Sequence, residues 1–376
     1  MYNKKAKRIA CSLYLIFFIV FFVFTTACSS GTDDNNHKVG NMTIARYSHT
    51  ATLLPSGEVL IAGGIITDNT GKTSSSIAEI YDISTGTFSL TGTMTTTRSS
   101  HTATLLPTGT VLITGGSYLG SAELYDPSTG DFIPTGNITT GREGHSATLL
   151  PNGKVLIAGG YSVNLGDNLR STELYDPDTG TFSYAGDMTD ARSFHTATLL
   201  PNGKVLIAGG LEPKFSGEII YAELYDPSVG IFSPHIYMTV GHALHTATLT
   251  PNGNVLIAGG HNLGYGSAEL YDPLTNTFSI TGNLIDSPRT SHTATFLSNG
   301  KVLIAGGLNR GNSLNSAELY DPSTGTFISA GDMFTGRKGH SATLLPNGKV
   351  LIAGGFHNDN SLDSVERYDP STGTFK

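Results

Sequence analysis

The chain has 376 residues, of which 46 are Gly and only 14% are charged, and its formal net charge is −8. A 38% apolar content with so little charge argues against a disordered chain, and the acidic balance argues against a nucleic-acid partner, which needs a basic face. The Gly content argues against a helical protein and predicts many short strands joined by tight turns.

The N-terminus has the three parts of a secretory signal. A basic stretch over residues 1–8 precedes an apolar run over residues 9–24, which leads to Ala27-Cys28. The segment resembles a bacterial lipoprotein signal, in which the Cys is lipidated and starts the mature chain. We therefore expect residues 1–27 to be a signal peptide and Cys28 to carry lipid. The alternative is an uncleaved anchor helix, although sixteen apolar residues are short for a full membrane span.

Residues 28–38 are polar and rich in Ser and Asn, which predicts a flexible tether between lipid and domain. Such an anchor places the protein in a bacterial cell envelope, on the outer membrane or the cell surface, with the membrane as one partner. The second Cys, Cys11, lies within the signal. The folded part therefore has neither a disulfide nor a thiol for catalysis.

After the tether, one unit recurs seven times. Each copy resembles His-Thr-Ala-Thr-Leu-Leu, a Pro-Asn-Gly turn, Val-Leu-Ile-Ala-Gly-Gly, a variable stretch, and Glu-Leu-Tyr-Asp followed by a turn and a Phe. The recurring residues are His49, His101, His145, His195, His245, His292 and His340, with Glu79, Glu123, Glu173, Glu223, Glu269, Glu318 and Glu366, and with Phe88, Phe132, Phe182, Phe232, Phe278, Phe327 and Phe375.

Each unit predicts four antiparallel strands, which we name A to D in chain order. Asn-Gly is the preferred signal for the hairpin between strands A and B. Strand B, Val-Leu-Ile-Ala, is apolar on both faces, as a strand covered on both sides must be. Because a four-stranded sheet cannot bury both faces alone, the copies must stack on one another. Radial stacking predicts an all-β fold, a seven-bladed β-propeller over residues 39–376.

Four apolar residues ending in Gly-Gly, followed by a Tyr and then an aromatic residue at a fixed distance, resemble the kelch repeat. The resemblance runs from about residue 42 to the end of the chain, and it implies the same propeller of four-stranded blades. The departure is that the aromatic residue is Phe in all seven copies, where kelch repeats usually have Trp. Val39-Gly40-Asn41-Met42 matches the piece that would follow Phe375. We expect this segment to complete blade seven.

Length variation is concentrated between the Gly pair and the Glu, where 6 to 14 residues intervene. These B–C loops share a face with the D–A connections, and loops on a rigid scaffold are where binding usually lies. Their aromatic, amide and charged residues suit a glycan or a polar protein surface. The alternative interpretation is that they are ordinary solvated loops that tolerate insertions.

The fourth unit departs most from the repeat. We expect His235 and Tyr237 in its D–A connection into blade five, together with His242, which replaces the repeated Arg. We predict a ligand site between blades four and five, and the alternative is neutral drift. The other residues expected at this site are Phe215, Tyr221, His261 and Tyr265.

The recurring His residues are interpreted as structural, donating to neighbouring backbone, because sevenfold symmetry spreads them around a ring instead of converging them on one metal ion. No metal and no cofactor is predicted. We expect the recurring Arg and Glu to form ion pairs within or between blades. The Arg residues are Arg46, Arg98, Arg142, Arg192, Arg289 and Arg337.

The main functional hypothesis is a non-catalytic module that binds a protein or a glycan through its B–C loop face. The alternative is a carbohydrate-active enzyme with its site around His235, Tyr237, His242 and His261, and a third option is a purely structural surface protein. The kelch resemblance also implies a possible copper oxidase, since some kelch propellers are enzymes that use copper with a Tyr cross-linked to a Cys. That chemistry is ruled out because the folded part has no Cys.

Overall fold

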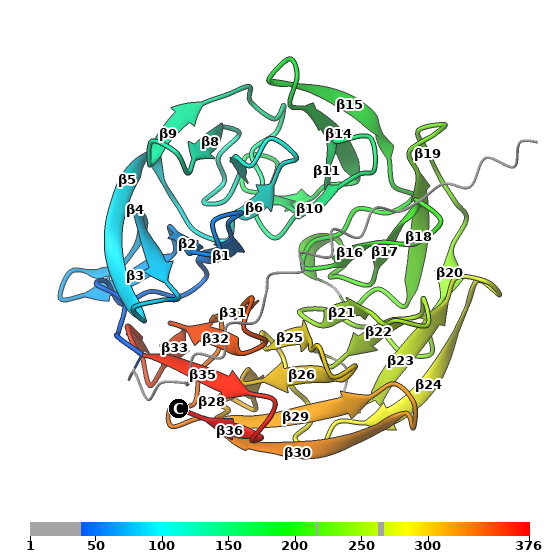
Figure 1. The fold of residues 1–376 in the computed structure, drawn as a ribbon. Helices are drawn as coiled ribbons and strands as arrows, with labels where there is room; N and C mark the ends of the chain where they lie inside the picture. Colours follow the sequence, from blue (N-terminus) through cyan, green and yellow to red (C-terminus); the bar gives the residue numbers. More distant parts are fainter. Residues whose placement is uncertain (1–38, 216, 262–266) are drawn as a thin grey trace, which may run out of the picture. The chain divides into compact units, whose positions relative to one another are not determined.

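The structure, a computed structural model, describes residues 39–215, 217–261 and 267–376. These residues form seven antiparallel sheets, each built on the same four strands, arranged as blades around a central axis (Figure 1). The predicted all-β, seven-bladed propeller is therefore confirmed. The expected signal peptide, the tether and Cys28 lie outside the described residues.

The four strands of each blade follow the chain from the axis outward. Strand A is β1 (Thr50–Leu53), β6 (Thr102–Leu105), β10 (Ser146–Leu149), β16 (Thr196–Leu199), β21 (Thr246–Leu249), β25 (Thr293–Phe296) and β31 (Ser341–Leu344). Strand B is β2 (Val59–Ala62), β7 (Val111–Thr114), β11 (Val155–Ala158), β17 (Val205–Ala208), β22 (Val255–Ala258), β26 (Val302–Ala305) and β32 (Val350–Ala353). Strand C is β4 (Gly71–Asp82), β8 (Ala122–Asp126), β14 (Ser171–Asp176), β18 (Tyr221–Asp226), β23 (Ser267–Asp272), β29 (Ser316–Asp321) and β35 (Val365–Asp369).

Strand D is continuous in most blades and divided in blade four. It is β5 (Thr87–Arg98), β9 (Asp131–Pro134), β15 (Thr181–Asp187), β19 (Ile231–Phe232) with β20 (Ile236–Tyr237), β24 (Thr277–Asn283), β30 (Thr326–Asp332) and β36 (Thr374–Phe375). The B–C loops add β3 (Ile65–Asp68), which pairs with β4, and three small hairpins. These are β12 (Tyr161–Ser162) with β13 (Asp167–Asn168), β27 (Leu308–Asn309) with β28 (Asn312–Ser313), and β33 (Phe356–His357) with β34 (Asn360–Ser361).

The described part of the chain contains one short helical turn, η1 (Pro213–Phe215), in the B–C loop of blade four. Within the described ranges, no helix combines the length and the apolar character that crossing a bilayer requires.

Strand B explains why the blades stack. In blade one, Val59 and Ile61 are buried against blade seven, whereas Leu60 and Ala62 are buried against blade two. Since successive side chains of a strand point to opposite faces, a strand that is apolar throughout supplies both interfaces at once. Seven apolar clusters of this kind fill the spaces between adjacent blades.

The Phe of strand D is paired across the sheet with the Tyr of strand C. The two rings lie 4.8–5.0 Å apart between centroids in every blade. The Tyr side chains are almost completely buried. Phe therefore occupies the aromatic position of the kelch repeat by packing on its own blade's Tyr, and the replacement of Trp leaves the fold unchanged.

The ring of blades is closed in two places, at the innermost strands and where the N-terminal segment packs beside blade seven. Each innermost strand contacts the innermost strands of both neighbouring blades, with β31 against β1 completing the circle. At the outer end of blade seven, Val39 and Met42 are buried in the apolar cluster between blades seven and one. The backbone N–H of Met42 donates to the carbonyl of Asp363 at 2.9 Å. The N-terminal segment therefore takes the place expected for it beside blade seven.

The recurring His residues form a circuit around the axis. Each imidazole Nε2 shares a hydrogen bond of 2.9–3.0 Å with a Ser or Thr hydroxyl of the preceding blade, the residue that follows the His there. Seven such bonds join all seven blades. The structural interpretation of these His residues is supported, but the partner is a side-chain hydroxyl of the neighbouring blade and not the expected backbone group.

The first Gly of each pair at the end of strand B is required by this packing. A Cβ at Gly63 would lie 2.7 Å from Cε1 of His101 and 2.6 Å from the carbonyl oxygen of Arg98, and its φ is +63°. Both the close approach and the left-handed backbone demand Gly at this position.

Candidate functional site

The D–A connections are fastened by buried ion pairs in six of the seven blades. The guanidinium Nη2 lies 2.6–2.9 Å from a Glu Oε1 in Arg46–Glu79, Arg98–Glu123, Arg142–Glu173, Arg192–Glu223, Arg289–Glu318 and Arg337–Glu366. Each Arg Nη1 also donates to the carbonyl of the first Gly in the pair, at 2.8–3.0 Å. The predicted Arg–Glu pairs are confirmed, and each holds a connection onto the blade that follows it.

His242 occupies the seventh position of this set. Its Nδ1 lies 2.7 Å from the carbonyl of Gly259, to which it donates, and its Nε2 lies 3.3 Å from Glu269 Oε1. Burial raises the pKa of Glu269, but hydrogen bonds from His242 and from two backbone N–H groups outweigh burial and hold the pKa below its ordinary value. His242 therefore makes the two contacts that the repeated Arg makes in the other connections. Because it is fully buried, it presents nothing to a ligand.

A second departure from the repeat gathers polar side chains at the outer end of blade four. Pro234 has no N–H for the strand ladder, and strand D is interrupted between Phe232 and Ile236. His235 lies in this interruption. The equivalent positions of other blades hold Thr91, Thr135 and Thr281, whose hydroxyls bond to the Tyr of the next blade. The His235 ring instead lies against its own blade, beside Tyr221 at the start of β18.

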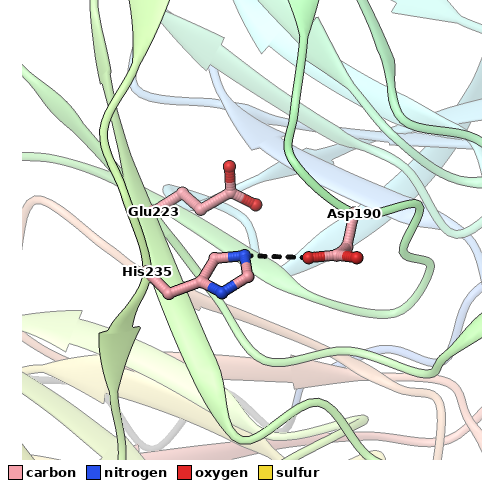
Figure 2. A group of neighbouring side chains, drawn as sticks. All are labelled: Asp190, Glu223 and His235. Carbon is pink, nitrogen blue, oxygen red and sulfur yellow. Dashed lines mark ion pairs between the residues drawn. The ribbon is translucent and has the colours of Figure 1, made fainter.

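The partner of His235 comes from the preceding connection. His235 Nε2 lies 2.8 Å from Oδ2 of Asp190, which belongs to the segment joining β15 to β16 (Figure 2). The side chains of His235 and Asp190 are 25% and 39% exposed. The carboxylate of Glu223, on β18, completes a group of three whose nearest donor atoms all lie within 4.8 Å of one another. We call Asp190, Tyr221, Glu223, His235 and Tyr237 the blade-four cluster.

Tyr221 connects the members of the cluster. Its ring stacks on the His235 ring at 3.9 Å between centroids, with 18° between the planes. Its hydroxyl donates to Asp190, and burial together with this bond raises the pKa of Tyr221 above its ordinary value. The Arg192 guanidinium lies 5.4 Å from the centre of the same ring. Imidazole, phenol and guanidinium thus pack together with two carboxylates between them.

Tyr237 extends the cluster to the surface. Its side chain is 66% exposed, and its ring stands edge-on to both Tyr221 and His235. Since strand C begins and strand D ends on the face that carries the B–C loops, the cluster lies on that face. Its members come from blade four and from the connection out of blade three, so the residues meet at the seam between blades three and four and not between blades four and five as expected from the sequence.

The remaining predicted residues are placed apart from this cluster. His261 is 68% exposed and forms an ion pair through Nδ1 with Glu218, which bridges blade five and the B–C loop of blade four. Phe215 ends η1, and its side chain lies outside the described residues, as does all of Tyr265. The structure therefore brings together His235, Tyr221 and Tyr237 from the predicted set.

The opposite face has shallow grooves of a different character. One of about 420 Å³ lies between the turns of blades five and six and is lined in part by Pro251, Lys301 and Asp321. Equivalent turn residues line the grooves between blades three and four and between blades seven and one. Because these grooves repeat with the scaffold, they single out no blade.

Asp190 is the functional candidate that the sequence interpretation missed. It belongs to a connection whose equivalent position holds Thr96, Thr140 and Thr335 in other units. The departure from Thr was visible in the sequence, but a second Asp, Asp286, occupies the same position before blade six. The contact between Asp190 and His235 distinguishes the two, and it becomes apparent only in the folded chain.

Comparisons with known proteins agree with this architecture. The family model of the Kelch motif matches residues 145–189, 289–334 and 337–376, which are blades three, six and seven. A search of curated proteins found no match.

Solved structures that share the fold include the two described here. One, described as the structure of YjhT, has a TM-score of 0.59 and 14% identity over 75% of this chain and 98% of its own. The other, a fungal alcohol oxidase of the AA5 family in complex with copper, has a TM-score of 0.55 and 18% identity over 91% of this chain and 67% of its own. At such low identity the likeness concerns the fold alone. The chain thus carries kelch motifs on a seven-bladed β-propeller of four-stranded antiparallel blades.

Proposed function

We propose that this protein is a secreted, lipid-anchored binding module that holds a glycan or a protein partner on its B–C loop face without catalysing a reaction. The observation that carries the proposal is the blade-four cluster, where exposed Tyr237 stands beside the stacked rings of Tyr221 and His235. The sevenfold scaffold needs none of these three residues, since other blades keep the fold with Thr, Ser or Asp at the same positions.

The chemistry of the cluster favours a glycan over a protein. An aromatic face covers the apolar C–H side of a sugar ring, and convergent polar groups orient its hydroxyls. Tyr237 supplies the first, and the Asp190 carboxylate with the His235 imidazole supplies the second. The B–C loop of blade three adds support, because the Asn168 side-chain amide donates to the carbonyls of Leu211 and Glu212 and so holds the neighbouring loop in place.

The test is binding of the full chain, in detergent, to a glycan array. We expect retention of a subset of glycans by the wild type and loss of that retention in Tyr237→Asp, which introduces the residue found at this position as Asp187 and Asp332. Phe334→Thr is the matched control, because Phe334 is an exposed aromatic residue, 79% exposed, in the D–A connection from blade six to blade seven. It should bind like the wild type.

Other results of the array experiment would assign a different function or a different site. Conversion of a bound glycan would favour the carbohydrate-active enzyme. Capture of a protein by cross-linking through Tyr237, with no retained glycan, would assign a protein partner. If the Tyr237→Asp chain retains the same glycans as the wild type, the blade-four cluster is not the site.

The lipid anchor is a separate part of the proposal. It rests on the resemblance of residues 1–28 to a bacterial lipoprotein signal and implies a place in the cell envelope, on the outer membrane or the cell surface. Mass spectrometry of the mature protein should find its first residue to be Cys28 carrying acyl chains. Cys28→Ser should lose them and leave the membrane fraction. An intact N-terminus beginning at Met1 would instead establish the uncleaved anchor.

A further inference from the structure

We propose that Asp190, Glu223 and His235 form a binding site for a divalent transition metal ion of the zinc class. The sequence predicts no metal site here, and the inference goes beyond the proposed binding of a glycan or protein. Its test uses the metal alone, so its outcome is independent of that function.

The first support is the state of two donor atoms. His235 Nε2 and Asp190 Oδ2 are shielded from solvent and lie 2.8 Å apart, yet neither has a hydrogen-bond partner of good geometry among the described residues. Buried polar atoms normally find such a partner. Two donors that bind one zinc ion at about 2 Å each lie about 3 Å apart, so the observed separation suits a shared ion.

The second support is the set of donors. An imidazole nitrogen with two carboxylates suits Zn²⁺ or a similar transition metal, whereas Ca²⁺ and Mg²⁺ prefer oxygen ligands throughout. The three residues come from separate segments: Asp190 from the connection, Glu223 from β18, and His235 from the interruption of strand D (Figure 2). Three protein donors leave a coordination position for water or for an oxygen of a ligand.

The third support is the arrangement around the donors. Glu223 is held by Nη2 of Arg192 at 2.7 Å and by the backbone N–H of Thr189 at 2.7 Å, and Asp190 accepts the hydroxyl of Tyr221. Such outer contacts orient ligands in metal sites. Two carboxylates and one guanidinium leave a net charge of −1 beside the imidazole, which attracts a divalent cation.

Blade six provides a built-in comparison. Asp286 and Glu318 occupy the positions of Asp190 and Glu223, but the position of His235 is Ala330. There Asp286 pairs with Nη2 of Arg289 at 3.5 Å. The two blades therefore share the carboxylates, and the imidazole sets blade four apart.

The experiment is a titration of the metal-stripped full chain with ZnCl₂ at neutral pH, followed by calorimetry, with the visible absorption of bound Co²⁺ as a second readout of the coordination geometry. We expect one equivalent to bind. His235→Thr and Asp190→Thr should each weaken binding by about tenfold or more, since even the partners of metal ligands contribute on that scale. Asp286→Thr is the matched control in blade six, and it should bind zinc like the wild type.

Both blade-four substitutions introduce the residue that other units carry, as in Thr91 and Thr140, so the fold is expected to persist. Thermal melting in the presence of a chelator checks this. Zinc should then raise the melting temperature of the wild type and of Asp286→Thr but not of His235→Thr. A wild-type chain that takes up no zinc, or a His235→Thr chain that binds it like the wild type, overturns the proposal.

Discussion

The blade connections and the outer end of blade four use similar residues for opposite purposes. In six connections a buried Arg–Glu pair recurs with almost unchanged distances, and in the seventh His242 reproduces the same two contacts. At the outer end of blade four, His235 and Asp190 meet near the surface without hydrogen-bonding well to each other. A histidine that departs from the repeat can therefore either take over a structural contact, as His242 does, or belong to a candidate site, as His235 does. The residues around it determine which of the two roles it has.

The difference teaches where a repeat protein can change. Positions between blades are constrained on both sides, so a substitution there must reproduce the lost contacts, as His242 does. The outer ends of strands C and D face solvent on one side, and a larger side chain such as Tyr221 or Tyr237 can be accommodated there. The following experiments separate the two regions.

Acid is expected to act most strongly, and it acts on the scaffold. Burial lowers the pKa of five of the seven ring His residues from 6.5 to about 3, and that of His245 and His340 well below 6.5. The unfolded chain therefore binds up to seven more protons than the folded chain between these values. Stability should therefore fall progressively as the pH drops below 6.5, because each of these His residues is kept neutral in the folded chain and takes up a proton on unfolding.

Denaturant unfolding at pH 7.5, 6 and 5 measures this effect. Replacing one ring histidine, His195→Asn, should reduce the slope of stability against pH by one proton. Equal free energies of unfolding at pH 7.5 and pH 5 would show that the ring is not neutral and buried as described.

Removal of one buried Arg is expected to have the next largest effect. Arg142→Ala leaves Glu173 buried without its partner and should cost about 3–5 kcal/mol of stability. Lys154→Ala, in the same blade, breaks an ion pair in which the Lys is 40% exposed, and it should cost less than about 1 kcal/mol. Thermal melting distinguishes the two. Similar losses of stability in both variants would contradict the conclusion that the buried Arg–Glu pairs stabilise the D–A connections.

His242→Arg tests whether His242 belongs to the scaffold. The Arg should form the contacts seen in the other six connections, leaving the free energy of unfolding unchanged or raising it by about 1 kcal/mol, the scale of one added hydrogen bond. Ligand binding and zinc binding should stay as in the wild type. If the variant keeps its fold but loses ligand binding or zinc binding, His242 contributes to the binding site after all.

Tyr237→Asp should have the smallest effect on stability and the largest on glycan binding. The side chain is 66% exposed, and surface substitutions usually change stability by less than about 0.5 kcal/mol. Denaturant unfolding alongside the array experiment measures both. If Tyr237→Asp lowers the free energy of unfolding as much as Arg142→Ala does, Tyr237 is a structural residue of the scaffold.

The repeat predicted much of the fold because each unit carries its own strands, turns and two-sided apolar strand. It also predicted the pairing of Arg with Glu, since Glu recurs at a fixed position in all seven units and Arg at a fixed position in six of them. The partner of the ring His was not predicted correctly. The Ser or Thr that follows each His is visible in the sequence, but its contact with the next blade's His exists only in a closed ring.

The sequence by itself determined the number of blades, the strands within them and the unit that departs from the rest, because these depend on local pattern and repetition. Tertiary structure alone decided which of the departing residues meet. His235 and Asp190 are 45 residues apart, and they are joined because the connection from blade three passes over the place where Pro234 interrupts blade four. His242 is seven residues from His235, yet it is buried in the next connection. Separation along the chain therefore did not predict which side chains lie close together in space, because residues of adjacent blades come together only in the folded propeller.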